Sequence, residues 1–144
     1  MGNRHCIILK SADMKIAQYR MARPTNQLGR IADFYTRVIG LPLIGSFTGH
    51  GGYDGVMIGL PGAGHHLEFT QHTVPVALPA PTAEHLLVLY FEEPEAYQEA
   101  VLRMKDEGLH AVAPENPYWL GRSETFEDPD GWRVVLYNGI FVQD

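Results

Sequence analysis

The chain has 144 residues, 45% of them hydrophobic, with 17 acidic and 11 basic side chains. This length and hydrophobic content allow one compact domain with a sizeable core. The formal net charge is -6 and the basic residues are scattered, which excludes the clustered positive surface of a nucleic-acid-binding protein. No apolar run approaches the roughly 20 residues that cross a bilayer. We therefore expect neither a nucleic acid nor a membrane as a partner.

The segment over residues 1–15 is expected to be a flexible extension. Its apolar core, residues 7–9, is too short for the hydrophobic region of a secretory signal. Cys6 is the only cysteine, so an internal disulfide is excluded and a reducing cytoplasm is the expected compartment.

The first unit of structure is expected over residues 16–72, and it reads as a strand, a helix and three further strands. The helix follows Pro24, with Thr25 or Asn26 as its N-cap, and Gly40 ends it. Its buried stripe consists of residues at helical spacing, namely Leu28, Ile31, Tyr35 and Val38. The strands are separated by glycine-rich turns and cover residues 15–22, 41–47, 53–60 and 65–71.

A proline-rich joint over residues 73–82 leads to a second unit, residues 83–144, with the same order of elements. Pro94 lies near the first turn of its helix, residues 93–108, and Gly108 ends that helix. Its strands are expected over residues 85–91, 109–113, 123–128 and 132–137.

The order β-α-β-β-β therefore occurs twice, and landmarks recur at a nearly constant offset. Gly40 and Gly108 are 68 residues apart, while Gly64 and Gly131 are 67 residues apart. The repeat predicts an α+β fold of two tandem βαβββ modules. We expect each sheet to bury one face under its own helix and the two remaining faces to meet at a cleft.

Alternation along the strands predicts which side chains face this cleft. In the strand that closes the first unit, Leu67 and Phe69 point to the helix, so His66, Glu68 and Thr70 point to the cleft. The other residues expected to face the cleft are Arg20, Ala22, His85, Leu87, Leu89, Arg133, Val135 and Tyr137. The residues of the same strands expected to face the helices are Tyr19, Met21, Leu86, Val88, Tyr90, Val134 and Leu136.

Four cleft-facing positions are equivalent in the duplicated plan. They lie in the first and last strands of the two units and hold Arg20, Glu68, His85 and Val135. Mixed sets of histidine and glutamate on neighbouring strands are typical of divalent metal sites that leave positions open for a substrate.

The duplicated plan, together with the stretches "IADFYTRVIGLPL", "HLEFTQ" and "EDPDGWRVVLY", resembles the vicinal oxygen chelate superfamily. This superfamily includes glyoxalase I, extradiol dioxygenases and the bleomycin- and fosfomycin-resistance proteins. The resemblance covers about residues 16–142. It implies a curved mixed sheet around a cup, the glyoxalase/bleomycin-resistance/dioxygenase fold, often in a dimer. We therefore expect a homodimer.

Enzymes of this superfamily commonly chelate a metal through His, Glu, His and Glu at the four equivalent positions. Glu68 and His85 match that pattern, whereas Arg20 and Val135 depart from it. A guanidinium keeps its charge and offers no lone pair to a cation, and valine offers none either. A site for Fe, Mn, Ni or Zn made by Glu68 and His85, with waters, His66 or His50 added, stays open. We favour no cofactor, with Arg20 pairing Glu68 instead.

A loop before the last hairpin carries two aromatic residues and an arginine, Tyr118, Trp119 and Arg122. The rings can stack on a planar ligand and Arg122 can hold a carboxylate. Packing in the core or at a dimer contact explains the same residues. The ligand-binding candidates are thus Tyr137, Trp119, Arg133, His66, Tyr118 and Arg122.

Three functions are compatible with these residues. The first, which we favour, is a metal-free protein that binds or sequesters a small molecule in the cup. The second is a metal-dependent lyase, isomerase or dioxygenase that uses Glu68 and His85 as ligands, base or acid. The third is a metal-free acid–base enzyme in which Arg20 takes over the electrophilic role of the metal.

Overall fold

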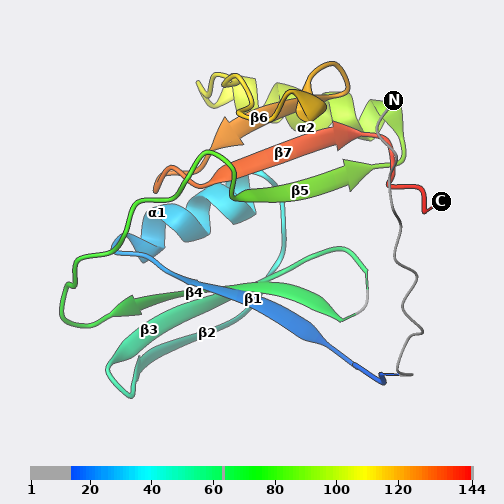
Figure 1. Cartoon of the computed structure of the whole chain (residues 1–144). Coiled ribbons are helices and arrows are strands. Elements are labelled where there is room, and N and C mark those ends of the chain that lie inside the picture. The colour runs from blue at the N-terminus through cyan, green and yellow to red at the C-terminus, as the bar shows by residue number, and fades with distance from the viewer. Residues whose placement is uncertain (1–13, 63, 144) are drawn as a thin grey trace, which may run out of the picture.

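The computed structural model describes residues 14–62 and 64–143, and its two sheets share one hydrophobic core (Figure 1). The flexible extension predicted over residues 1–15 therefore lies outside the described residues except for its last two, and Cys6 lies outside them as well. Among the described residues, no helix is long and apolar enough to cross a membrane.

The first sheet has the strand order β1-β4-β3-β2. Its strands are β1 (Tyr19–Pro24), β2 (Leu43–His50), β3 (Tyr53–Gly59) and β4 (His65–His72). β1 runs parallel to β4, and the other neighbouring strands are antiparallel. The connection from β1 to β2 is helix α1 (Leu28–Asp33), which continues as the π-helical segment η1 (Phe34–Val38).

Helix α1 begins later than the sequence predicts, because its N-cap is Gln27 and not Thr25 or Asn26. The hydroxyl of Thr25 accepts a hydrogen bond from the backbone amide of Gln27 at 3.1 Å. The side-chain oxygen of Gln71 accepts one from the amide of Leu28 at 2.9 Å. Since Gln71 belongs to β4, the first turn of the helix is fixed to its own sheet.

The second sheet has the strand order β5-β7-β6, with β5 (Leu86–Phe91), β6 (Ser123–Glu127) and β7 (Arg133–Asn138). β5 runs parallel to β7, and β6 is antiparallel to it. Helix α2 (Pro94–Asp106) follows β5, and the short 3₁₀ helix η2 (Pro117–Trp119) precedes β6.

The strand predicted over residues 109–113 is wrong. Only one bridge forms there, between Val112 and Thr125. Pro114 follows the segment and has no amide hydrogen for a ladder. The carbonyl of Ala113 accepts from the Arg133 guanidinium at 3.1 Å, a bond that replaces a strand partner.

The shared core confirms the α+β fold of two modules. Ile31, Tyr35 and Val38 of the predicted helical stripe are buried, and Gly40 ends the segment with a φ of 97°. The buried residues come from both modules and comprise Ile31, Phe34, Tyr35, Val38, Leu41, Ile58, Leu67, Phe69, Met104, Phe126, Val134 and Leu136. The orientations predicted for Leu67, Phe69, Val134 and Leu136 are therefore confirmed.

The alternation predicted for β5 is wrong. Leu87, Leu89 and Phe91 pack against the core, so Leu86 and Val88 lie on the opposite face. The cause is the parallel register with β7, in which Leu87 stands beside the buried Val134 and Leu89 beside the buried Leu136. Paired residues of neighbouring strands share a face, so the pairing decides the orientation that periodicity alone left ambiguous.

The packing also changes the predicted meeting of the two sheets. Within the chain, the faces that meet are those that the helices cover, and α1 lies between the two sheets (Figure 1). We call the other side of each sheet its open face. The open face of the first sheet carries Arg20, Ala22, Met57, His66, Glu68 and Thr70. The open face of the second carries Leu86, Val88, Tyr90, Thr125, Val135 and Tyr137.

Candidate functional site

A cluster of polar side chains lies on the open face of the first sheet. Arg20 donates from Nε to Nε2 of His66 and from Nη1 to Oε2 of Glu68, each at 2.9 Å. The parallel register sets Arg20 beside His66 and the small Ala22 beside Glu68, so the guanidinium can reach diagonally over Ala22 to the carboxylate. The side chain of Arg20 is 47% exposed and that of Glu68 is 15% exposed.

Within this polar cluster, Arg20 occupies Oε2 of Glu68 and Nε2 of His66, which are atoms that a metal could otherwise use. The guanidinium of Arg20 lies against both Glu68 and His66, and a histidine that accepts at Nε2 carries its proton on Nδ1. Among the described residues, no three His, Cys, Asp or Glu side chains are arranged to hold a metal ion. The donor set on this face therefore does not fit a divalent cation.

His85 and Val135 lie elsewhere. Val135 lies on the open face of the second sheet and is fully buried. His85 precedes β5, with Nδ1 at 2.6 Å from the hydroxyl of Thr82 and its ring 5.6 Å from that of Trp132. It lines a largely apolar cleft of about 380 Å³ between the modules, together with residues that include Met21, Leu67, Phe69, Leu87, Trp132 and Arg133. The chain does not bring the four equivalent positions together.

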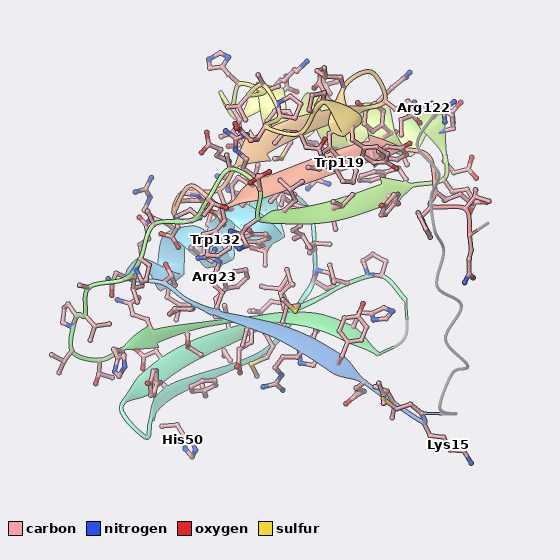
Figure 2. The ribbon with its side chains drawn as sticks, in the orientation of Figure 1. Lys15, Arg23, His50, Trp119, Arg122 and Trp132 are labelled. Carbon is pink, nitrogen blue, oxygen red and sulfur yellow. The ribbon has the colours of Figure 1, made fainter. Side chains whose placement is uncertain are left out.

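At the junction of the modules, Arg23 makes contacts that the sequence analysis missed. Its guanidinium binds Asp128 at 2.7 Å and Asp130 at 2.8 Å, and it lies over the rings of Phe69 and Trp132. Figure 2 shows Arg23 beside Trp132 where the two halves meet. The alternation along β1 could have revealed these contacts. Arg23 is two residues after Met21 and so points to the same side, towards the core, where a guanidinium needs a carboxylate.

The carboxylate of Asp128 is fully used by this junction. Its Oδ2 accepts from Arg23 and from the hydroxyl of Tyr35 at 2.7 Å, and its Oδ1 accepts from the backbone amides of Asp130 and Trp132. Burial raises the pKa of Asp128, while the bonds from Tyr35, Arg23 and the backbone act against this rise. Burial also raises the pKa of Tyr35 well above its ordinary range, and the Asp128 charge adds to the effect.

A cluster of four rings lies on the second module. The ring of Tyr137 in β7 is 5.3 Å from Tyr90 in β5 and 6.0 Å from Trp119 in η2, whose own ring is 4.9 Å from Tyr118. The side chain of Asn116 accepts from the amide of Tyr118 and so caps η2. We call Tyr90, Tyr118, Trp119 and Tyr137 the aromatic cluster.

The candidate residues therefore divide into three places. Arg20, His66 and Glu68 meet on the first sheet. Three predicted rings meet in the aromatic cluster, where Tyr90 joins them although the sequence placed it under the helix. Of the remaining three, His85 and Arg133 line the cleft between the modules, and Arg122 lies beside the end of β7, where its carbonyl accepts from the amide of Asn138.

Two mixed sheets, each following the β-α-β plan with its first and last strands parallel, define a protein of the glyoxalase/bleomycin-resistance fold in the vicinal oxygen chelate superfamily. The model of the YycE-like N-terminal domain matches residues 19–70, and that of the YycE-like C-terminal domain matches residues 84–138. The chain belongs to the YycE-like family.

Individual relatives agree with this assignment. The uncharacterized protein YycE of Bacillus subtilis is 46% identical over 129 residues, which cover 88% of this chain and 91% of the relative. A crystal structure of B. subtilis YycE superposes with a TM-score of 0.85 at 42% identity, covering 94% of this chain and 98% of that one. The antibiotic-binding protein TnmS3 from Streptomyces sp. CB03234 gives a TM-score of 0.62 at 22% identity, covering 91% and 100%.

Proposed function

We propose that the chain binds a small organic molecule without a metal ion, in a cup that two copies of the chain complete. The observation that carries this proposal is the position of Arg20, whose guanidinium binds both Glu68 and His66. A permanent positive charge at the centre of the donor set repels a divalent cation and offers an anionic or carbonyl group of a ligand a partner.

The metal-dependent alternative would need Glu68 free to act as a ligand. Its carboxylate is instead neutralised by Arg20 at 2.9 Å. Within one chain, the ring of His85 contacts Thr82 and Trp132 instead.

The open faces support the homodimer. Each open face lies on the side of its sheet away from the shared core. Within one chain, the polar open face of the first sheet and the aromatic open face of the second therefore do not face each other. β1 and β5 are edge strands, and both border the cleft between the modules. In a twofold dimer, β1 of each copy can lie beside β5 of the other, so that both edge strands of both copies are paired. The polar cluster of one copy then faces the aromatic side chains on the second sheet of the other.

Exposed apolar side chains on these edges favour the same assembly. Met21 of β1 is 66% exposed, and Tyr19 beside it is also exposed. An edge strand with free backbone groups and apolar side chains is a template for pairing with another chain.

Ligand binding by a distant relative is consistent with the proposal. TnmS3 is an antibiotic-binding protein with the same fold. We propose a comparable role for this chain, as a protein that holds and sequesters a small molecule.

Calorimetric titration of the purified chain with Zn²⁺, Ni²⁺, Mn²⁺ and Fe²⁺ tests the metal-free part. We expect no stoichiometric binding by the wild type, because Arg20 occupies the donor set. Stoichiometric binding that disappears in Glu68→Ala and His85→Ala would overturn the proposal.

A thermal-shift screen of small organic molecules tests the binding part. A true ligand raises the melting temperature with concentration, and Arg20→Ala should lower that response. Light scattering of the same samples measures the mass, which the proposal expects to be that of two chains.

A further inference from the structure

The aromatic cluster brings together rings from three separate segments of the second module. Tyr90 comes from β5, Tyr137 from β7, and Tyr118 and Trp119 from η2. Trp119 meets both Tyr137 and Tyr118 at nearly right angles, with interplanar angles of 88° and 89°. A planar molecule that stacks on one ring of such a corner meets the edge of the next, which is a favourable geometry for both contacts.

Two rings of the cluster are exposed to solvent, and Trp119 and Tyr137 are partly exposed. Tyr90 is 43% exposed and Tyr118 is 64% exposed. Val135, two residues before Tyr137 on the same face of β7, is fully buried. Large rings that serve only as core are ordinarily more deeply buried, so a group of partly exposed rings is typical of a binding surface.

Three phenol hydroxyls accompany the rings. Among residues 14–62 and 64–143, none of the hydroxyls of Tyr90, Tyr118 and Tyr137 has a hydrogen-bond partner in the chain. Burial raises the pKa of Tyr90, and the neighbouring Tyr118 and Tyr137 raise it further. The three hydroxyls are therefore able to donate hydrogen bonds to a ligand.

A positive charge lies at the border of the cluster. A Cβ built on Gly139 would lie 3.1 Å from the ring of Tyr137 and 3.9 Å from Nη1 of Arg122, so the guanidinium lies close to the ring. Figure 2 shows Arg122 at the same end of the second module as Trp119. A cationic ligand would be repelled here, whereas an anionic substituent would be attracted.

We infer that the aromatic cluster binds a planar, polycyclic aromatic molecule with carbonyl oxygens on its rings, a quinone-type ligand. The ring system stacks in the corner formed by Trp119 and Tyr137, and the carbonyl oxygens accept hydrogen bonds from the phenols. This inference rests on the proposed small-molecule binding and adds the chemical class of the ligand.

The two tryptophans of the chain make the site directly observable. Trp132→Phe leaves Trp119 as the only reporter, and Trp119→Phe leaves Trp132, which lines the cleft between the modules. The probes are anthraquinone sulfonate and anthracene sulfonate, which share the skeleton and the charge and differ in the ring carbonyls. Calorimetry on the wild type measures both affinities independently of the variants.

We expect anthraquinone sulfonate to quench Trp119 in Trp132→Phe and to leave Trp132 in Trp119→Phe unchanged. Each phenol hydrogen bond lost should weaken binding about fivefold, the effect of roughly 1 kcal/mol. Tyr90→Phe should therefore raise the Kd of the quinone but not that of anthracene sulfonate. Tyr97→Phe, which removes a phenol hydroxyl from α2, is the matched control and should change neither.

Equal affinity for the two probes would overturn the role of the phenols. Quenching confined to Trp132 would overturn the location. If other small molecules stabilise the chain while neither probe binds, the ligand class is wrong and the proposed function stands. If no small molecule stabilises the chain, the proposed function itself fails.

Discussion

Strand β1 carries two arginines, Arg20 and Arg23, that are three residues apart and lie on opposite faces. Arg23 is 13% exposed and binds two carboxylates of the other module. Arg20 is 47% exposed and binds Glu68 and His66 of its own sheet. The same type of side chain therefore has two roles in β1. Arg23 holds the modules together on one face, and Arg20 forms a candidate ligand contact on the other.

The difference follows from burial. A buried charge needs full compensation, and the loss of one partner from a buried pair costs about 3–5 kcal/mol. An exposed pair is screened by water and contributes about 0.2–1 kcal/mol. We therefore expect substitutions around Arg23 to change stability and substitutions around Arg20 to change binding.

The largest effect is expected for Asp128→Ala. The substitution leaves the guanidinium of Arg23 with one carboxylate fewer and orphans the hydroxyl of Tyr35. The free energy of unfolding should fall by about 3–5 kcal/mol. Urea denaturation monitored by circular dichroism measures this free energy.

Asp33→Ala is the matched control for that experiment. Asp33 also pairs with an arginine, Arg37, but both side chains are about half exposed. Its loss should change stability far less than Asp128→Ala does, because water screens an exposed pair. Equal effects of the two substitutions would contradict the special role of the junction.

A smaller effect is expected for Tyr35→Phe, which removes only the hydroxyl that donates to Asp128 at 2.7 Å. Hydrogen bonds to charged groups contribute about 1.5–3 kcal/mol, and the ring remains to fill the core. The free energy of unfolding should fall within this range in the same assay. A neutral result would show that another donor replaces the hydroxyl.

The junction also predicts a pH dependence. Because burial raises the folded-state pKa of Asp128 above 3.8, the folded chain takes up a proton there at a higher pH than the unfolded chain. The contribution of Asp128 to stability therefore increases as the pH falls towards 3.8 and is lost as the pH rises through the folded-state pKa. Hydrogen bonds from Arg23 and Gln27 outweigh burial and lower the pKa of Asp130, whose contribution is lost below 3.8.

Unfolding of the wild type and of Asp128→Ala at several pH values isolates the contribution of Asp128, because the two proteins share all other carboxylates. The stability gap between the two proteins should widen from about pH 7 to about pH 4. A gap that narrows steadily over this range would mean that the folded-state pKa of Asp128 is depressed.

Periodicity and turn residues predicted the modules, because a local pattern of apolar residues determines them. Leu67, Phe69, Val134 and Leu136 face the core as predicted. The alternation along the strands also predicted that Glu68 and Arg20 lie on the same face, which allows their ion pair. The orientation of β5 was mispredicted because its run from Leu86 to Phe91 is apolar at every position, and only pairing with β7 decides it.

The junction could not be predicted from local patterns. Arg23 and Asp128 are 105 residues apart, and their contact depends on how the two modules pack. The same holds for the aromatic cluster, since Tyr90 reaches it only in the observed orientation of β5. The Arg20–Glu68 contact within one sheet was predictable from the alternation along its strands, whereas contacts that depend on packing between elements were not.

The smallest effect on stability is expected at the Arg20–Glu68 pair. In a double-mutant cycle with Arg20→Ala and Glu68→Ala, the coupling energy should be about 0.2–1 kcal/mol, because Arg20 is half exposed. The same two substitutions should change the response to a ligand in the thermal-shift screen. A coupling energy as large as that expected at the Arg23 junction would give Arg20 a structural role, and the polar cluster would then not be a binding site. A small coupling with altered binding would keep the two faces of β1 in separate roles.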